Sequence, residues 1–178
     1  MTERKKIVVI IGSLDVGGAE KDIVRNYPLI NKTHDIVILL YSHRGKLASE
    51  IEKEGVKVIC MPPKQKKKSF FHKILWIENS ILACKFVYRL IKTLLFLRSK
   101  IKSEKADIIH AFLPLSYVYA SFIKISMFYN KPLLIMSRLS LNFYFAKHKI
   151  LKILETQICH KIVDIAVGNS KAILKDLL

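Results

Sequence analysis

The residues best suited to chemistry are the glycines of one short loop, Gly12-Ser13-Leu14-Asp15-Val16-Gly17-Gly18. Glycine lets a backbone approach a ligand closely, and the N–H groups at the start of a following helix can bind an anion. Gly17 and Gly18 are therefore candidates for binding a phosphate or another part of a substrate. Alternatively, both glycines serve only a tight turn, and their spacing does not separate the two interpretations.

This loop departs from two common phosphate-binding motifs. The dinucleotide fingerprint G-x-G-x-x-G requires a glycine where Leu14 stands. The P-loop requires a lysine and then a serine or threonine where Gly18 and Ala19 stand. The sequence therefore argues against an ATPase and against a simple NAD-binding domain.

Four further candidates follow predicted strands. His110 ends the predicted strand 106–110, Arg138 follows 133–137, and Asn169 and Ser170 follow 162–167. A histidine titrates near neutral pH and can act as acid, base or hydrogen-bond donor, while a guanidinium suits phosphate or carboxylate. Alternatively, His110 only forms hydrogen bonds at the edge of the sheet, and Arg138 only forms an ion pair at the surface. The other histidines lack the spacing of metal ligands, so no metal site is expected: His34, His43, His72, His148 and His160.

Alternating strand and helix patterns would position these residues. Apolar, β-branched runs predict strands over 5–11, 35–41, 56–60, 106–110, 133–137 and 162–167. Periodic apolar stretches predict helices over 19–30, 46–54, 69–102, 114–128, 147–160 and 170–178. This order predicts an α/β fold, a Rossmann-like, doubly wound and mostly parallel sheet flanked by helices. Because ligands bind at the carboxyl ends of such strands, we expect the candidates along one edge.

Composition narrows the class of protein. The 178 residues predict one domain, and the net charge of +17 predicts an anionic partner such as a membrane, a nucleic acid or a phosphorylated substrate. Three scattered cysteines predict neither disulfides nor a zinc site, and indicate a reducing compartment. The first apolar stretch is too short for a signal peptide, which favours a cytoplasmic protein.

The segment 64–102 combines a lysine run with an unusually apolar helical pattern. Charges recur too often for a transmembrane span. The pattern fits either a buried helix with one solvated stripe or a helix lying in a membrane interface. The second interpretation predicts a protein held peripherally on the inner face of the cell membrane. Its predicted membrane contacts are Lys64, Lys66, Lys67, Lys68, Trp76, Lys85, Arg89 and Lys92.

Four blocks together resemble the N-terminal, acceptor-side domain of the family 4 retaining glycosyltransferases, which have the GT-B fold. They are Gly17-Gly18-Ala19-Glu20, the segment from Ala106 to Leu113, the segment from Met136 to Asn142, and Val167-Gly168-Asn169-Ser170-Lys171-Ala172. Their order and spacing agree across the whole chain, so residues 1–178 are expected to form this one domain.

The resemblance implies a cleft shared with a C-terminal domain that binds a nucleotide-sugar donor. Gly17 and Gly18 would approach the donor diphosphate, and His110 would lie near the transferred sugar. Some family members carry H-x-H there, where this chain has Phe112 at the second position. No cofactor is implied beyond the nucleotide-sugar substrate, and acceptors in the family are often lipid-linked.

The family's donor domain, with its Glu-x7-Glu motif, is expected to be absent, because no two glutamates of the chain stand eight apart. The implied function is the acceptor-binding half of a glycosyltransferase in cell-surface glycan, glycolipid or lipopolysaccharide synthesis. It would be inactive without a second domain, for example a separately encoded one. The alternative is a non-catalytic module that binds a membrane surface or a partner. Nucleic-acid binding is not expected, because no known motif places the lysines among stacking aromatic residues.

Overall fold

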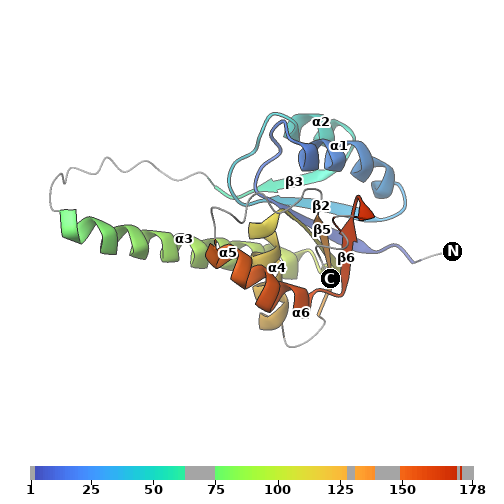
Figure 1. Cartoon of the computed structure of the whole chain (residues 1–178). Coiled ribbons are helices and arrows are strands. Elements are labelled where there is room, and N and C mark those ends of the chain that lie inside the picture. Colours follow the sequence, from blue (N-terminus) through green and yellow to red (C-terminus); the bar gives the residue numbers. More distant parts are fainter. Residues whose placement is uncertain (1–2, 63–74, 128–130, 139–148, 172, 174–178) are drawn as a thin grey trace.

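The protein forms one parallel β-sheet between two layers of helices (Figure 1). The structure, a computed structural model, describes residues 3–62, 75–127, 131–138, 149–171 and 173, and their side chains except those of 75–86, 149, 150 and 152. The strands are β1 (Lys6–Ile11), β2 (Asp35–Leu40), β3 (Lys57–Cys60), β4 (Ile108–Phe112), β5 (Leu133–Arg138) and β6 (Ile165–Gly168). The helices are α1 (Gly18–Asn31), α2 (Ala48–Lys53), α3 (Leu75–Ser103), α4 (Pro114–Ser126), α5 (Lys149–Leu154), η2 (Glu155–Cys159) and α6 (His160–Ile162).

All neighbouring strands pair in parallel, in the order β3-β2-β1-β4-β5-β6. From β1, the next strands in sequence, β2 and β3, are added toward one edge of the sheet. From β4, strands β5 and β6 are added toward the other edge. The boundary between β1 and β4 is the topological switch point at which doubly wound sheets bind ligands. The predicted Rossmann-like α/β fold is confirmed, and the short strand β3 lies at one edge of the sheet.

Both faces of the sheet are buried, which explains the nearly continuous apolar strands. Successive residues of β1 alternate between two cores: Val9 and Ile11 pack toward α1 and α2, while Val8 and Ile10 pack toward α3 and α4. These four side chains are fully buried. Because shifting a strand by one residue would exchange the faces of its side chains, this dense burial pins the register of the central strands.

Several predicted boundaries differ from the structure. Strand β4 begins two residues later than expected and continues to Phe112, because Ala111 and Phe112 are as buried as the residues before them. The expected helix 147–160 contains the π-helical segment η2 and continues to Ile162, which delays β6 to Ile165. In α2, the helix ends as predicted before Gly55, whose φ of +79° is easy only for glycine.

Helix α3 lies against α4 at its C-terminal end and extends away from the sheet at its N-terminal end (Figure 1). The predicted contacts Lys64, Lys66, Lys67 and Lys68 lie outside the described residues, as do the side chains of Trp76 and Lys85. Arg89 and Lys92 are exposed on α3. Within the described chain, no helix has the length and apolar character needed to cross a membrane.

Candidate functional site at the carboxyl edge of the sheet

The glycine loop follows β1 at the switch point, as predicted. Gly17 is the residue that precedes the first turn of α1, and no side chain caps this helix start. A Cβ added to Gly18 would meet no heavy atom within 4 Å. The backbone at Gly18 therefore borders open space at the carboxyl edge, where a ligand can approach it closely.

The Glu20 carboxylate folds back over Gly17. A Cβ on Gly17 would lie 2.2 Å from Glu20 Oε2, so this position needs a glycine while Glu20 keeps its place. The carboxylate already provides negative charge at the positive end of the α1 dipole. A phosphate beside Gly17 would meet that charge, whereas sugar hydroxyls could donate hydrogen bonds to it.

A carboxylate and an imidazole meet beside the glycine loop, and sequence reasoning missed this pair. His43 Nε2 lies 2.6 Å from Asp15 Oδ2, and the Ser13 hydroxyl donates to the same oxygen over 2.9 Å. The Ser13 hydrogen bond, helped by His43, holds the pKa of Asp15 below its usual value. Asp15 follows β1 and His43 follows β2, and these two strands are neighbours. The proximity of Asp15 and His43 could therefore have been predicted from the topology of the sheet. The pair could accept or donate a proton at the edge of the site.

The turns after β1 and β2 form one rigid wall. Leu14 donates its N–H to the Arg44 carbonyl over 3.3 Å, and Leu47 donates to the Leu14 carbonyl over 2.8 Å. Gly45 lies between them with φ of +75°, and a Cβ there would overlap the Leu14 carbonyl carbon at 2.2 Å. Glycine at this position therefore allows the two loops to approach each other.

Leu113 holds a strained backbone at the end of β4. Its φ of 73° and ψ of 150° fall in a region that is populated almost only by glycine. The residue sits directly before Pro114, which begins α4, and its side chain is 36% exposed. Strain of this kind costs about 1–3 kcal/mol and is characteristic of functional sites. Its position across the switch point from the glycine loop supports a ligand site there.

His110 does not end its strand, which corrects the predicted end of this strand. It occupies the middle of β4, opposite Val9 and Ile135. Its Nδ1 lies 2.5 Å from the Tyr27 hydroxyl and its Nε2 lies 2.7 Å from the Ser137 hydroxyl. Phe112 stacks on the ring at a centroid distance of 4.6 Å and is nearer the carboxyl edge. The imidazole thus links α1, β4 and β5 inside the domain.

Burial lowers the pKa of His110 to about 4, so the ring is neutral at physiological pH. Burial also raises the pKa of its partner Tyr27 above the usual value for a tyrosine. A neutral imidazole with hydroxyl neighbours at both nitrogens can accept one hydrogen bond and donate another. This arrangement can position β4 and β5 and hold the wall beneath the site. His110 as a catalytic residue stays a prediction.

Arg138 ends β5 as predicted but is buried rather than exposed, with 5% of its surface accessible. Its guanidinium lies 3.4 Å from Oε1 of Glu155, a fully buried carboxylate of η2, and His160 Nε2 lies 3.7 Å from the same oxygen. Arg138 therefore forms an ion pair in the interior of the domain, not at its surface as the alternative interpretation expected. The π-helical turn of η2 contributes Glu155 and is a feature often found at functional sites.

Asn169 and Ser170 follow β6 at the same edge, as predicted, and both are exposed. Ser170 Oγ accepts the N–H of Ile173 over 3.3 Å, which is the geometry of a helix N-cap. The carboxyl edge thus collects the glycine loop, Arg138 and this pair, but not His110. Among the described residues, no group of three or more His, Cys, Asp or Glu side chains could hold a metal ion.

No protein-family model and no curated protein sequence matches the chain. Several solved structures have a similar fold. They include HepE from Anabaena in complex with UDP and glucose, with 12% identity, a TM-score of 0.68, and coverage of 98% of this chain and 40% of HepE. A glycosyltransferase from Rickettsia africae has 16% identity and a TM-score of 0.62, with coverage of 99% and 40%.

A putative UDP-N-acetylglucosamine 2-epimerase from Listeria monocytogenes has 14% identity and a TM-score of 0.60, with coverage of 98% and 41%. This chain therefore spans about two fifths of the length of these proteins. At such low identity the similarity establishes the fold. The chain has the Rossmann-like α/β fold found in glycosyltransferases of the GT-B class.

Proposed function

We propose that this chain is the acceptor-side half of a glycosyltransferase, acting with a second domain that binds the nucleotide-sugar donor. The fold similarity to HepE, crystallised with UDP and glucose, is the observation that carries the proposal. Of the four sequence blocks of the family 4 resemblance, the described residues Gly17, Gly18, Arg138, Asn169 and Ser170 lie at the carboxyl edge of the sheet. The proposed pathway is the synthesis of a cell-surface glycan or glycolipid, such as lipopolysaccharide.

Within this function, the glycine loop forms one wall of the cleft. Gly18 offers open backbone to the donor or the acceptor, while the Glu20 carboxylate accepts hydrogen bonds from sugar hydroxyls. Arg138, which is buried beside Glu155, and the exposed Asn169 and Ser170 are the other predicted substrate contacts at this edge. His110 positions the strands beneath, and its catalytic role near the transferred sugar stays a prediction. The donor domain completes the other wall.

Binding of nucleotide-sugars to the chain, compared between a site variant and a matched control variant, tests this function. We expect UDP- or GDP-sugars to bind the chain only when the product of the adjacent reading frame is present. Gly18→Leu fills open space at the helix start and should weaken that binding at least ~tenfold, because tenfold corresponds to only about 1.4 kcal/mol. Ser49→Leu adds the same side chain at an exposed position of α2 and should change nothing. Absence of binding in both arms would contradict the split-enzyme proposal.

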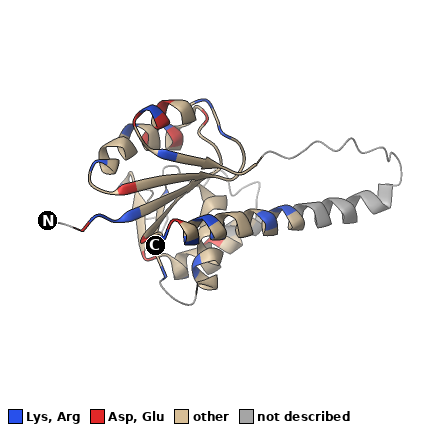
Figure 2. Cartoon of the chain, turned by 180° about the vertical axis from the view of Figure 1, so that it is seen from behind, with Lys and Arg blue, Asp and Glu red and all other residues tan. Residues whose placement is uncertain are grey.

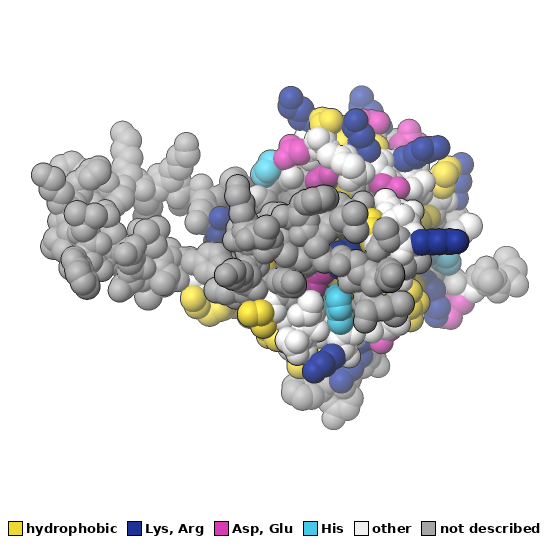
Figure 3. Space-filling view, in the orientation of Figure 1, with side chains coloured by type: hydrophobic (Ala, Val, Ile, Leu, Met, Phe, Trp, Pro, Cys, Tyr) yellow, Lys and Arg dark blue, Asp and Glu magenta, His cyan; other side chains and the backbone are white. Residues whose placement is uncertain are grey.

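We further propose that α3 holds the protein on the anionic inner leaflet of the cell membrane, near a lipid-linked acceptor. Val87, Tyr88, Ile91 and Leu95 form one exposed apolar stripe, because their spacing keeps them within about a third of the helix circumference. Figure 3 shows exposed hydrophobic side chains together at the lower left of the body. Figure 2 shows basic residues along the described part of α3, and Arg89 and Lys92 of this helix are exposed.

This surface also suits the alternative function, a non-catalytic module that binds membranes.

Sedimentation with phosphatidylglycerol vesicles tests whether this surface of α3 binds a membrane. Replacing Arg89 and Lys92 by Glu should weaken vesicle binding about tenfold or more, at roughly 1 kcal/mol for each basic residue removed. Lys32 and Lys53, exposed near α1 and α2, give a control with the same change of charge. Binding that survives the α3 substitutions would contradict membrane docking through this helix. Membrane binding without sugar binding would favour the module.

A further inference from the structure

A hollow of about 980 Å³ lies at the amino edge of the sheet, opposite the proposed cleft. It is formed where the C-terminal ends of α3 and α4 meet the segments that lead into β4 and β5. The residues that matter for its chemistry are Arg98, Lys102, Lys105, Asp107, Ser126 and Lys131. None of the predicted site residues lines it.

The positive charge of this hollow is only partly neutralised, because Asp107 is the single carboxylate among the lining residues that the structure describes. Arg98 donates to the Ser126 hydroxyl over 3.0 Å and to its carbonyl over 3.3 Å, both uncharged partners. Lys102, Lys105 and Lys131 form no ion pair with any residue that the structure describes. The hollow therefore concentrates four cations.

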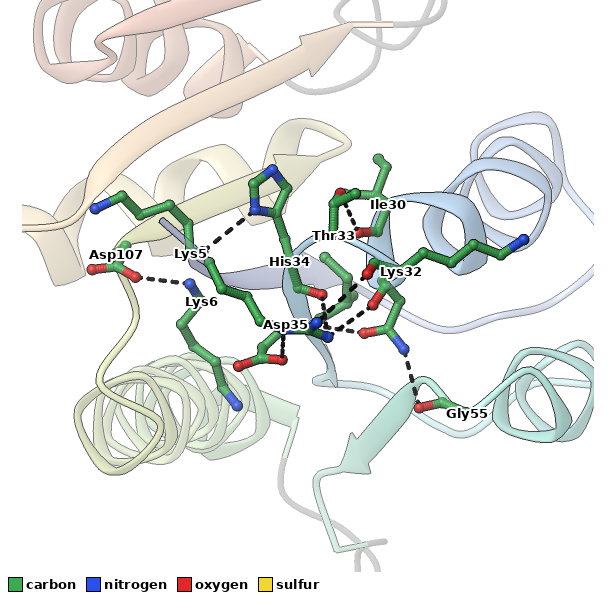
Figure 4. A network of polar contacts seen from close by, with 12 residues as sticks. Lys5, Lys6, Ile30, Lys32, Thr33, His34, Asp35, Gly55 and Asp107 are labelled. Carbon is green, nitrogen blue, oxygen red and sulfur yellow. Dashed lines mark hydrogen bonds and ion pairs between the residues drawn. The ribbon is translucent and has the colours of Figure 1, made fainter. Parts of the chain in front are cut away.

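The two nearest carboxylates are occupied elsewhere. Asp107 accepts the backbone N–H of Lys6 over 2.7 Å at the start of β1 (Figure 4). Glu104 lies 2.6 Å from Lys57 Nζ and 3.5 Å from Lys6 Nζ, and it does not line the hollow. These contacts fasten the neighbouring strands together. They leave the cations of the hollow available to a ligand.

Lys105 adds an independent observation, because it occupies a backbone position that favours glycine. Its φ is 51°, and it follows α3 in a Schellman motif, in which Ala106 N–H donates to the Ile101 carbonyl and Lys105 N–H to the Lys102 carbonyl. A left-handed residue with a side chain is strained, and strain that a fold retains points to function. Here the retained residue adds a cation to the hollow.

We propose that this hollow is a binding site for a phosphate-bearing anion, separate from the glycosyl-transfer cleft. Guanidinium and ammonium groups on converging segments are suited to the oxygens of a phosphomonoester or diphosphate. The same chemistry occurs in a soluble phosphate compound and in an anionic lipid headgroup. Leu95 lies one turn before Arg98, so the apolar stripe of α3 leads from the membrane-facing surface to the hollow.

Pyrophosphate binding to the whole chain, measured by calorimetry at low ionic strength, tests the site. The double substitution Lys102→Glu with Lys131→Glu should raise the Kd at least ~tenfold, because it reverses two of four charges. Lys32→Glu with Lys53→Glu changes the net charge equally and should leave the Kd within about twofold. Lys105→Gly should weaken binding by ~threefold and at the same time raise the melting temperature, since it relieves the strained backbone.

The opposite effects of Lys105→Gly on binding and stability separate a ligand site from a merely structural role. Pyrophosphate binding that the Lys102/Lys131 variant retains would overturn the proposal, and so would absence of binding to the parent. Vesicles of phosphatidylcholine with and without phosphatidic acid then identify the source. Vesicle binding that falls with the variant assigns the site to a lipid headgroup, and unchanged vesicle binding assigns it to a soluble phosphate. Neither outcome depends on sugar transfer.

Discussion

The buried His110 should make the fold sensitive to mild acid. Its pKa falls from the usual 6.5 to about 4 because the ring is buried, and its two nitrogens contact the hydroxyls of Tyr27 and Ser137. The unfolded chain binds a proton near pH 6.5, whereas the folded chain resists it until about pH 4. The neutral ring therefore contributes stability that is complete above pH 6.5 and is lost as the pH falls toward 4.

The size of this contribution follows from the two pKa values. The difference between 6.5 and about 4 corresponds to roughly 3 kcal/mol. A domain of this size is stable by about 5–15 kcal/mol, so the loss should be easy to measure. The pKa values of Asp35 and Glu104 are lowered below 3.8 and 4.5 by Arg4 and by Lys57, respectively. Their contributions are lost only at lower pH, which leaves the window between 6.5 and 4.5 largely to histidine.

Urea unfolding followed by circular dichroism at a series of pH values measures this effect. The parent chain should lose most of the ~3 kcal/mol between pH 6.5 and 4, whereas His110→Gln, which keeps an amide in place of the ring, should show a shallower slope over that window. The difference between the two curves removes the contribution of the other histidines. Parallel curves for parent and variant would refute the assignment of a buried, neutral His110.

Two further predictions concern the carboxyl edge. Glu155→Gln should lower the free energy of unfolding by about 3 kcal/mol, because it removes the buried carboxylate that faces the Arg138 guanidinium, and adding Arg138→Met should restore much of it; equal losses in the single and double variants would contradict the pairing. Leu113→Gly should raise the free energy of unfolding by about 1 kcal/mol, since the left-handed backbone there suits glycine; thermal unfolding checks the sign, and a destabilised variant would contradict the strain.

The layout of the fold could be predicted from the sequence because its strands are buried on both faces. Runs such as Ile7-Val8-Val9-Ile10-Ile11 are distinctive, and the turn residues between them mark the alternation with helices. The carboxyl edge followed from topology alone, since parallel strands end together. For this reason the glycine loop, Arg138 and the pair Asn169 and Ser170 lie where they were expected.

Features that depend on tertiary packing were not predictable. A polar residue after an apolar run resembles a strand end, which is why the sequence predicts one at His110, although this residue lies within β4 and the hydroxyls of Tyr27 and Ser137 are its partners. The π-helical turn at Glu155 leaves no mark on a helical pattern of apolar residues. Asp15 and His43 form a pair although they are far apart in the chain. Lys105 has a left-handed backbone, which residues with a side chain rarely adopt.

The central claim is that sugar transfer takes place at the carboxyl edge of this sheet. Backbone amide shifts of the isotope-labelled chain test it most directly, recorded with the donor-domain partner before and after a nucleotide-sugar is added. We expect changes at Gly17 and Gly18 and unchanged signals at Gly55, which lies at the opposite edge of the sheet. Changes confined to the amino edge, or no change on addition of any nucleotide-sugar, would contradict it.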